Sequence, residues 1–544
     1  MSQTLPVPGA RAARTASPRP AHAPRHTVSA RGGHLWPLLA CATLLTGFLV
    51  EPAASQTRRL GHIDFPNSGA SEAQKPFITG VLLLHSFEFE DAAEAFRRAE
   101  RADPDFALAY WGEAMTYNHP LWKQQDAAAA RAALGRLAPT AEARRAKAPT
   151  PRERGYLSAV ETLYGRGTKA ERDHGYMDAM RRLSEAHPDD LEARAFYALS
   201  ILGSRDGERD FATYMRAAAV AQSVFQADPE HPGAAHYLIH SFDDPIHAPL
   251  GLPAARAYSR IAPDAAHAQH MTSHIFLAMG MWSDVVAANI RARDVQNAAR
   301  ARRGLGPNVC GHYTSWLEYG FLMQGRLADA AATMDACHAR IGSGDNASER
   351  GYFADMRARY VLDTGDWAAA DRWSADLSAD PRARADYLFT SAYAAIMQGD
   401  APEGRRILAR LTSSHAPADG AGSRGGARPD DAVRPRERIQ AMEIEGLLAM
   451  ADGRAEEAIE TLRRAVALEE SLPFAFGPPA TLKPPHELLG ELQLQAGHPH
   501  DAVAAFRTAL ERTPLRANAL RGLAEAAEAS EARARLNRGS RDPR

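Results

Sequence analysis

Residues 77–115 read FITGVLLLHSFEFEDAAEAFRRAERADPDFALAYWGEAM, and their alternation of small, aromatic and turn-forming residues decides the fold. Residues 488–520, LLGELQLQAGHPHDAVAAFRTALERTPLRANAL, repeat the same pattern near the other end of the chain. The matching positions, with identical offsets, are Gly80, Ala92, Phe96, Ala99 and Pro104 in the first stretch and Gly490, Ala502, Phe506, Ala509 and Pro514 in the second. Internal repetition at this spacing predicts an array of similar units.

This pattern resembles the tetratricopeptide repeat (TPR) family, whose 34-residue unit is two antiparallel helices that pack small against large residues, with a proline ending the second. Turn glycines between expected helix pairs agree with it: Gly280, Gly325, Gly365, Gly399 and Gly453. The resemblance covers about residues 73–530 and implies an all-α fold, an α-solenoid of roughly ten to eleven TPR-like hairpins forming a curved superhelix. An aromatic content of only 7% also favours helix.

The N-terminus is typical of an export signal. Five arginines and no acidic residue occur in the first 35 residues, and LWPLLACATLLTGFLV follows at 35–50. We therefore expect an exported protein, periplasmic or extracellular, with the membrane involved only if this segment remains as an anchor. The expected order is a signal peptide or anchor at 1–55, an N-terminal TPR-like solenoid at 56–412, a flexible Gly/Ala/Pro/Arg linker at 413–436, C-terminal repeats at 437–530 and a disordered tail at 531–544.

The net charge limits the classes of partner that we expect, and the cysteines bear on the redox state of the compartment. A formal net charge of −2 gives no electrostatic reason to expect nucleic acid. We expect a protein or peptide ligand in the concave groove, with a small molecule as an alternative. In an antiparallel hairpin the ends that carry Cys310 and Cys337 are neighbours, and an oxidising compartment permits a disulfide between them, against two unpaired buried thiols.

Histidines concentrate in residues 231–276, HPGAAHYLIHSFDDPIHAPLGLPAARAYSRIAPDAAHAQHMTSHIF. His236 and His240 take the fifth and ninth positions of one unit, and His270 and His274 take the same positions of the next. Each pair is spaced i, i+4, so both rings leave one side of a helix. In the TPR family these positions face the concave groove, and the resemblance therefore implies that all four imidazoles face it.

The same repeat frame adds three further candidates. His85 and His119 are 34 residues apart at the thirteenth position of their units, and His312 falls at a second position. The remaining histidines of the stretch, His231, His247 and His267, are interpreted as boundary or loop residues. His486, beyond the linker, is a weak candidate.

Several neutral imidazoles that face one another favour a bound metal ion. Ligation satisfies their lone pairs, whereas burial without partners is costly. A nitrogen-rich set without cysteine suits copper, zinc or iron, and Asp243 or Asp244 could add a carboxylate. The predicted metal ligands are His236, His240, His270, His274, His85, His119 and His312. Structural polar packing and a groove for an acidic peptide stay open as alternatives.

Three functions follow from these patterns. The first is an exported TPR-repeat binding protein whose histidine cluster binds a transition metal, a protein or peptide ligand, or both. The second is a metal-dependent enzyme that uses the same cluster for redox or Lewis-acid chemistry. The third is a metal-free TPR scaffold for protein–protein interaction. Zinc-protease chemistry of the HExxH type is not supported, because Tyr237 stands where the glutamate would be.

Overall fold

The fold is all-α, as the sequence predicts. The computed structural model describes residues 58–207, 209–342, 346–378, 380–413 and 430–539. Its first helices are α1 (Ser71–His85), α2 (Phe89–Ala102), α3 (Ala107–Thr116), α4 (Ala127–Leu137), α5 (Ala141–Ala146), α6 (Pro151–Leu163), α7 (Lys169–Ala186), α8 (Leu191–Gly203), α9 (Phe211–Ala227), α10 (Pro232–Ser241), α11 (Ala248–Ile261) and α12 (Ala266–Ala278). They are followed by α13 (Trp282–Arg302), α14 (His312–Met323), α15 (Leu327–Ile341), α16 (Ala347–Thr364), α17 (Ala369–Arg372), α18 (Pro381–Met397), α19 (Ala401–Ser413), α20 (Asp430–Ala451), α21 (Ala455–Glu470), α22 (Pro485–Gln495), α23 (Pro499–Arg512) and α24 (Ala517–Gly539).

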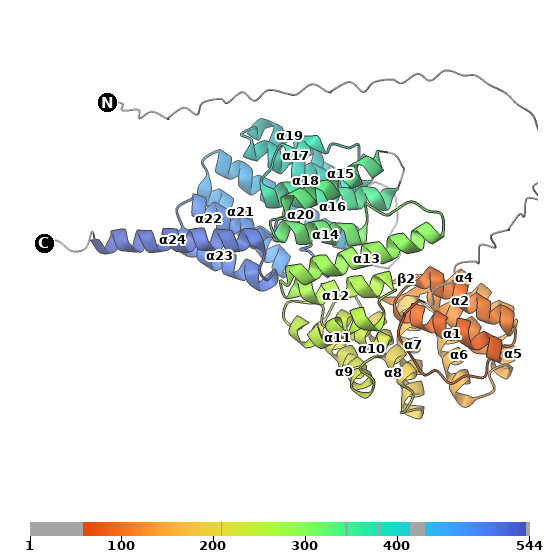
Figure 1. Ribbon diagram of the computed structural model, residues 1–544. Coiled ribbons are helices and arrows are strands. Elements are labelled where there is room, and N and C mark those ends of the chain that lie inside the picture. Colours follow the sequence, from red (N-terminus) through yellow and green to blue (C-terminus); the bar gives the residue numbers. More distant parts are fainter. Residues whose placement is uncertain (1–57, 208, 343–345, 379, 414–429, 540–544) are drawn as a thin grey trace, which may run out of the picture. The chain divides into compact units, whose positions relative to one another are not determined.

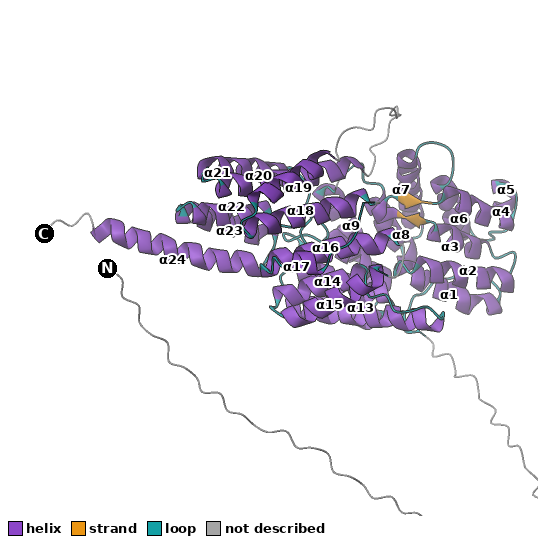
Figure 2. Ribbon diagram, turned by 90° about the horizontal axis from the view of Figure 1, so that it is seen from above, coloured by secondary structure: helices purple, strands orange, loops and turns teal. Residues whose placement is uncertain are grey.

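Consecutive helices pack in pairs, and each pair packs on the next (Figure 1). The chain is thus a TPR-like array of helical hairpins. The small strands β1 (Asn118–His119) and β2 (Gln124–Gln125) pair antiparallel around the 3-10 turn η1 (Pro120–Trp122) (Figure 2). The hairpins, in order, are α1/α2, α3/α4, α6/α7, α8/α9, α10/α11, α12/α13, α14/α15, α16 with the one-turn α17, α18/α19, α20/α21 and α22/α23.

The small and aromatic positions of the repeat interlock as expected. A Cβ atom added at Gly80 or Gly112 would overlap the buried ring of Phe96. The second stretch repeats this arrangement, because Gly490 and Gly522 leave the same room for Phe506. In these two repeats, the helix backbones therefore approach closely around one large ring.

The predicted boundaries need two corrections. Most of the predicted linker, 413–436, lies outside the described residues, but α20 already begins at Asp430, and one core cluster includes buried side chains from both sides of it, from Ala358 to Ala505. The array is therefore not divided there. The predicted tail, 531–544, is helical as far as Gly539, because its alanine-, glutamate- and arginine-rich sequence continues α24.

Cys310 and Cys337 form a disulfide that joins the start of the α14/α15 hairpin to its end, as the hairpin geometry predicts. The predicted signal or anchor at 1–55 lies outside the described residues. Among the described helices, none combines the length and the apolarity that a membrane crossing requires.

Candidate metal centre

Six histidines from three helices meet in two groups of three. Within each group, one ring nitrogen per residue lies within 4.8 Å of the other two. Site A is His236, His240 and His267, and site B is His270, His274 and His312. The first two ligands of site A come from α10, the last ligand of site B is the first residue of α14, and α12 supplies the rest. Neighbouring helices of the array are labelled in Figure 1.

The two sites adjoin each other. The ring centroids of His240 and His274 are 6.2 Å apart, and those of His267 and His270 are also 6.2 Å apart. The four histidines predicted as two i, i+4 pairs are buried, with exposed fractions of 0% for His236 and 7% for His274. The six rings thus form one continuous group that contains two candidate metal sites.

Hydrogen bonds determine which nitrogens of site B are free. The Nδ1 atom of His274 lies 2.6 Å from Asp243 Oδ2, and a carboxylate only accepts, so Nδ1 carries the proton. His270 Nδ1 likewise donates to Asn289 Oδ1 at 2.7 Å, and the Asn289 amide is oriented by its own bond to Val285 O. The two Nε2 atoms therefore present lone pairs to each other at 3.1 Å. This arrangement requires a cation between them, either a metal ion or a shared proton.

Site A repeats part of this arrangement. His236 Nδ1 donates to the backbone oxygen of His85 at 2.6 Å, which leaves its Nε2 as an acceptor. That Nε2, both ring nitrogens of His240, and His267 Nε2 are buried and have no hydrogen-bond partner within the described part of the protein. Buried nitrogens without partners are costly, and a metal ion would satisfy one from each ring. The protonated Nδ1 atoms of both sites match the outer contacts of metal-bound histidines.

Burial keeps these imidazoles neutral. It lowers the pKa of His236 to about 3, and neighbouring histidines add to the effect. Burial also lowers the pKa values of His240, His267 and His270 well below the ordinary value, again reinforced by nearby histidines. At neutral pH these rings therefore offer lone pairs rather than positive charge, which is the form that binds metals.

A third group, His85, Glu192 and His231, is fully buried, and its ring nitrogens face partners within the protein. His85 uses both nitrogens, Nδ1 with Tyr237 Oη at 2.8 Å and Nε2 with Glu192 Oε2 at 2.7 Å. His231 Nδ1 caps α10 by accepting the Ala234 N–H, so its proton is on Nε2, which faces Glu192. Burial opposes protonation of His231, yet Glu192 raises its pKa. The group is an ion-paired support for α10.

The predicted ligand set is therefore partly rearranged. The structure brings His236, His240, His270, His274 and His312 together, but it does not bring His85 or His119 to either site. His119 lies in β1 and stacks on Phe89 at a centroid distance of 4.0 Å. His267, interpreted from the sequence as a boundary residue, belongs to site A. Its spacing from His270 and His274, i, i+3 and i+7 on one helix face, was the signal that could have found it.

A groove of about 1240 Å³ reaches the edge of site B. Its lining includes His312 and Trp316, and the Trp316 ring contacts His274 and His270 at centroid distances of 4.4 and 4.7 Å. The four paired histidines are buried, and they are not among the described residues that line this groove. The most exposed histidine of the two sites is His312.

Residues 472–484, between α21 and α22, form another wall of this groove. The Gly477 backbone lies so close to the Trp316 ring that a side chain there would overlap it. Arg209 lies over the Phe476 ring at 4.8 Å and binds Asp244 at 3.0 Å, just after α10. One side of the groove beside site B is thus formed by a segment rich in proline and phenylalanine that comes from a distant repeat.

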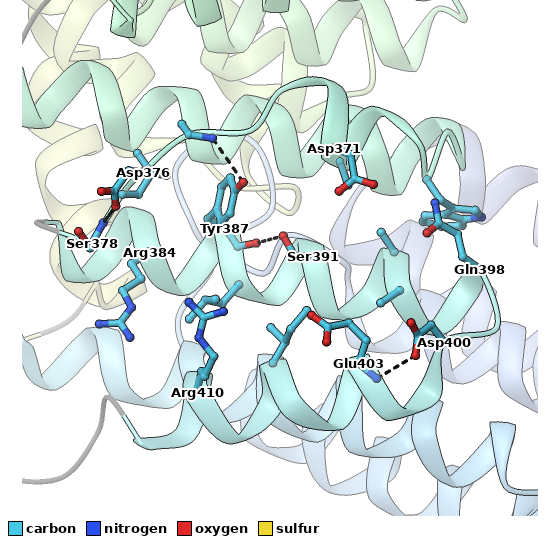
Figure 3. A pocket seen from close by; sticks show the side chains of 18 residues that line it. Asp371, Asp376, Ser378, Arg384, Tyr387, Ser391, Gln398, Asp400, Glu403 and Arg410 are labelled. Carbon is cyan, nitrogen blue, oxygen red and sulfur yellow. Dashed lines mark hydrogen bonds between the residues drawn. The ribbon is translucent and has the colours of Figure 1, made fainter.

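A second cavity, of about 520 Å³, lies among α17, α18 and α19 (Figure 3). Its lining mixes carboxylates with arginines and contains none of the candidate histidines. Several of its polar groups bond within their own turns, such as Asp376 with the Ser378 N–H and Asp400 with the Glu403 N–H.

No protein-family model and no curated protein matches this sequence. Among solved structures, the chain is similar to one from the APC/C hetero-tetramer Cut9–Hcn1, at 12% identity and a TM-score of 0.34 over 85% of this chain and 78% of that chain. It is also similar to yeast Tom70, at 11% identity and 0.32 over 84% and 88%, and to the P58(IPK) TPR domain, at 12% and 0.22 over 85% and 99%. Values this low transfer no functional property, and the description of the fold rests on the helices themselves.

Proposed function

We propose that this chain is a TPR-like protein that binds two transition-metal ions, one at site A and one at site B. The observation that carries the proposal is the pair of Nε2 lone pairs of His270 and His274, 3.1 Å apart while both Nδ1 protons are committed elsewhere. A proton shared by this pair would explain site B alone. The unpartnered nitrogens of site A favour metal at both sites.

Copper is the metal we expect to bind most tightly, with zinc and iron as weaker competitors. Each site offers three neutral imidazoles, and affinity of such ligands follows the order in which copper exceeds zinc and iron. Within the described ranges the cysteines Cys310 and Cys337 are bonded to each other and offer no thiolate to either site. That disulfide also supports the proposal that the protein is exported to an oxidising compartment.

The groove favours a catalytic role for the metal as a second candidate. Three protein ligands leave an open coordination position, which is typical of catalytic rather than structural sites. Because the groove reaches His312 and Trp316, a small organic or peptide ligand could approach the ion at site B. Redox or Lewis-acid chemistry on that ligand is the proposed reaction class. A protein or peptide partner in the groove is the binding alternative.

Metal content tests the proposal first. Protein purified without a histidine tag, loaded with Cu²⁺ or Zn²⁺ and then dialysed, is expected to retain two ions per chain by elemental analysis. Retention of none with either metal would reject the metal-binding function and leave the metal-free scaffold. Retention of a single ion would restrict the function to one site.

Asp243→Asn tests whether the carboxylate orients His274 for metal binding. The amide can still accept from Nδ1 but lacks the charge that makes the ring a stronger ligand, so we expect an affinity about 10–100-fold weaker at one of the two sites. Competition with a chelator of known affinity measures it. Asp335→Asn is the matched control, because Asp335 accepts a hydrogen bond from Trp373 outside both sites. Equal affinities in the two variants would contradict the assigned role.

A further inference from the structure

The turn after α1 differs from the other short hairpin turns. Phe87 occupies it with a φ of 53°, in the left-handed region that L-residues rarely adopt. In six other hairpins a glycine holds this position with positive φ: Gly280, Gly325, Gly365, Gly399, Gly453 and Gly497. The first repeat therefore keeps a bulky aromatic residue in a conformation that glycine adopts without strain.

The Phe87 side chain packs directly on site A. Its ring centroid is 4.3 Å from that of His236, and it stacks on His240 and His267 at 5.7 and 5.6 Å. The ring itself is buried. The same turn also orients a ligand, because the backbone oxygen of His85 accepts the Nδ1 proton of His236. A glycine at this position would preserve the turn but would remove the aromatic ring that covers site A.

Site B has a different environment. Its ligand His312 is exposed and lines the groove together with Trp316. The three ligands of site A are not among the described residues that line the groove, and His236 and His240 are buried. His267 is half-buried, with the Trp122 ring 6.3 Å away. The two sites share a ligand set of three imidazoles but differ in their access to solvent.

We propose that Phe87 closes site A, so that the two metal ions are inequivalent. The ion at site A is enclosed by the aromatic ring, and the ion at site B exchanges and takes up ligands from the groove. Phe87 is thus a positioning residue that excludes water from one ion of the pair. This inference rests on the proposed function, since it requires two bound ions.

Release of the metal to a chelator tests the inference. Protein loaded with two Zn²⁺ ions is mixed with excess chelator, and release is followed with time. The wild-type protein is expected to release its ions in two phases, a fast one from site B and a slow one from site A. Phe87→Gly is expected to accelerate the slow phase by about tenfold or more and to leave the fast phase unchanged, because the apolar shell controls solvent access.

Leu515→Gly is the matched control. Leu515 also has a positive φ, 55°, but its side chain is 52% exposed and contacts the turn at Gly280 rather than a histidine. This variant gains the same relief of backbone strain and should keep both phases. Phe87→Leu, which keeps an apolar cover, should fall between the wild type and Phe87→Gly, and it remains informative if the glycine variant unfolds.

The outcomes separate the two proposals. A protein that retains no metal rejects the proposed function. A protein that retains two ions but releases them in one phase, or whose slow phase is unchanged in both Phe87 variants, rejects only the role of Phe87. Acceleration of the slow phase in Leu515→Gly would show that strain relief, and not the cover, controls release.

Discussion

Replacement of His240 by alanine is expected to reduce the bound metal from two ions per chain to one, and His240→Ala combined with His274→Ala is expected to abolish binding. Each substitution leaves only two imidazoles at its site, and structural or catalytic sites of this kind use at least three protein ligands. Elemental analysis after dialysis measures the loss. The single variants should lose different ions, because the two residues belong to different sites.

His119→Ala is the matched control for this experiment. His119 was predicted as a ligand on its repeat position, but its ring stacks on Phe89 outside both sites. We expect it to keep two ions per chain. A double variant that still binds two ions, or a control that loses as much metal as His240→Ala, would contradict the assignment of the two sites.

The metal-free protein is expected to become less stable as the pH falls from 6.5 to 5. The folded pKa of His236 is about 3, lowered first by burial, whereas its unfolded pKa is about 6.5. Between these values the unfolded chain binds a proton that the folded chain does not, so the free energy of unfolding falls as the pH falls. At pH 5 this one residue costs about 2 kcal/mol.

Three other histidines of the two sites add to this effect, since the pKa values of His240, His267 and His270 are also lowered. Only His231 is expected to oppose it among the buried histidines considered above, because Glu192 raises its pKa. These contributions have the same sign as that of His236, so the loss of stability is larger than His236 alone would give. Urea unfolding of metal-free protein at pH 7.5, 6 and 5 measures it.

His236→Gln should weaken the pH dependence, since one lowered pKa is removed. His500→Gln serves as the control, because the His500 side chain is 93% exposed and should leave the dependence unchanged. A free energy of unfolding that stays constant from pH 7.5 to pH 5 would show that these imidazoles titrate alike in the folded and unfolded chains, and would contradict their lowered pKa values. A free energy of unfolding that instead rises as the pH falls would show that the folded chain binds protons more tightly than the unfolded chain, and would favour a shared proton over a metal ion.

The repeat pattern was sufficient to predict the helices and their pairing. Gly80, Phe96 and their counterparts Gly490 and Phe506 act through local packing, in which a missing Cβ on one helix admits a ring from its neighbour. These short-range contacts occur both near the start and near the end of the array, so the pattern of residues along the chain was enough to predict them. The start of α20 and the end of α24 were harder to predict from the sequence, since helix ends depend on packing against neighbouring repeats.

The candidate site was predicted in part for the same reason. His236 and His270, and likewise His240 and His274, occupy equal positions in adjacent repeats, so their rings leave equivalent faces of neighbouring helices. His85 and His119 also share a register, but side chains from other repeats decide their environment. His85 forms a hydrogen bond with Glu192, and the ring of Phe89 stacks on His119. The position of a histidine within the repeat indicates the helix face on which it lies. It does not indicate which side chains of other repeats it will contact.

The sequence by itself determined the helical repeat and the alignment of two histidine pairs one repeat apart. Only the tertiary structure decided that His267 and His312 complete two sites of three ligands, that Asp243 and Asn289 hold protons on the outer nitrogens, and that Phe87 covers one site while the other meets the groove. The physical reason is the distance along the chain over which each interaction acts. Helix periodicity acts over a few residues, whereas ligand number, tautomer and burial depend on contacts between residues far apart in the chain.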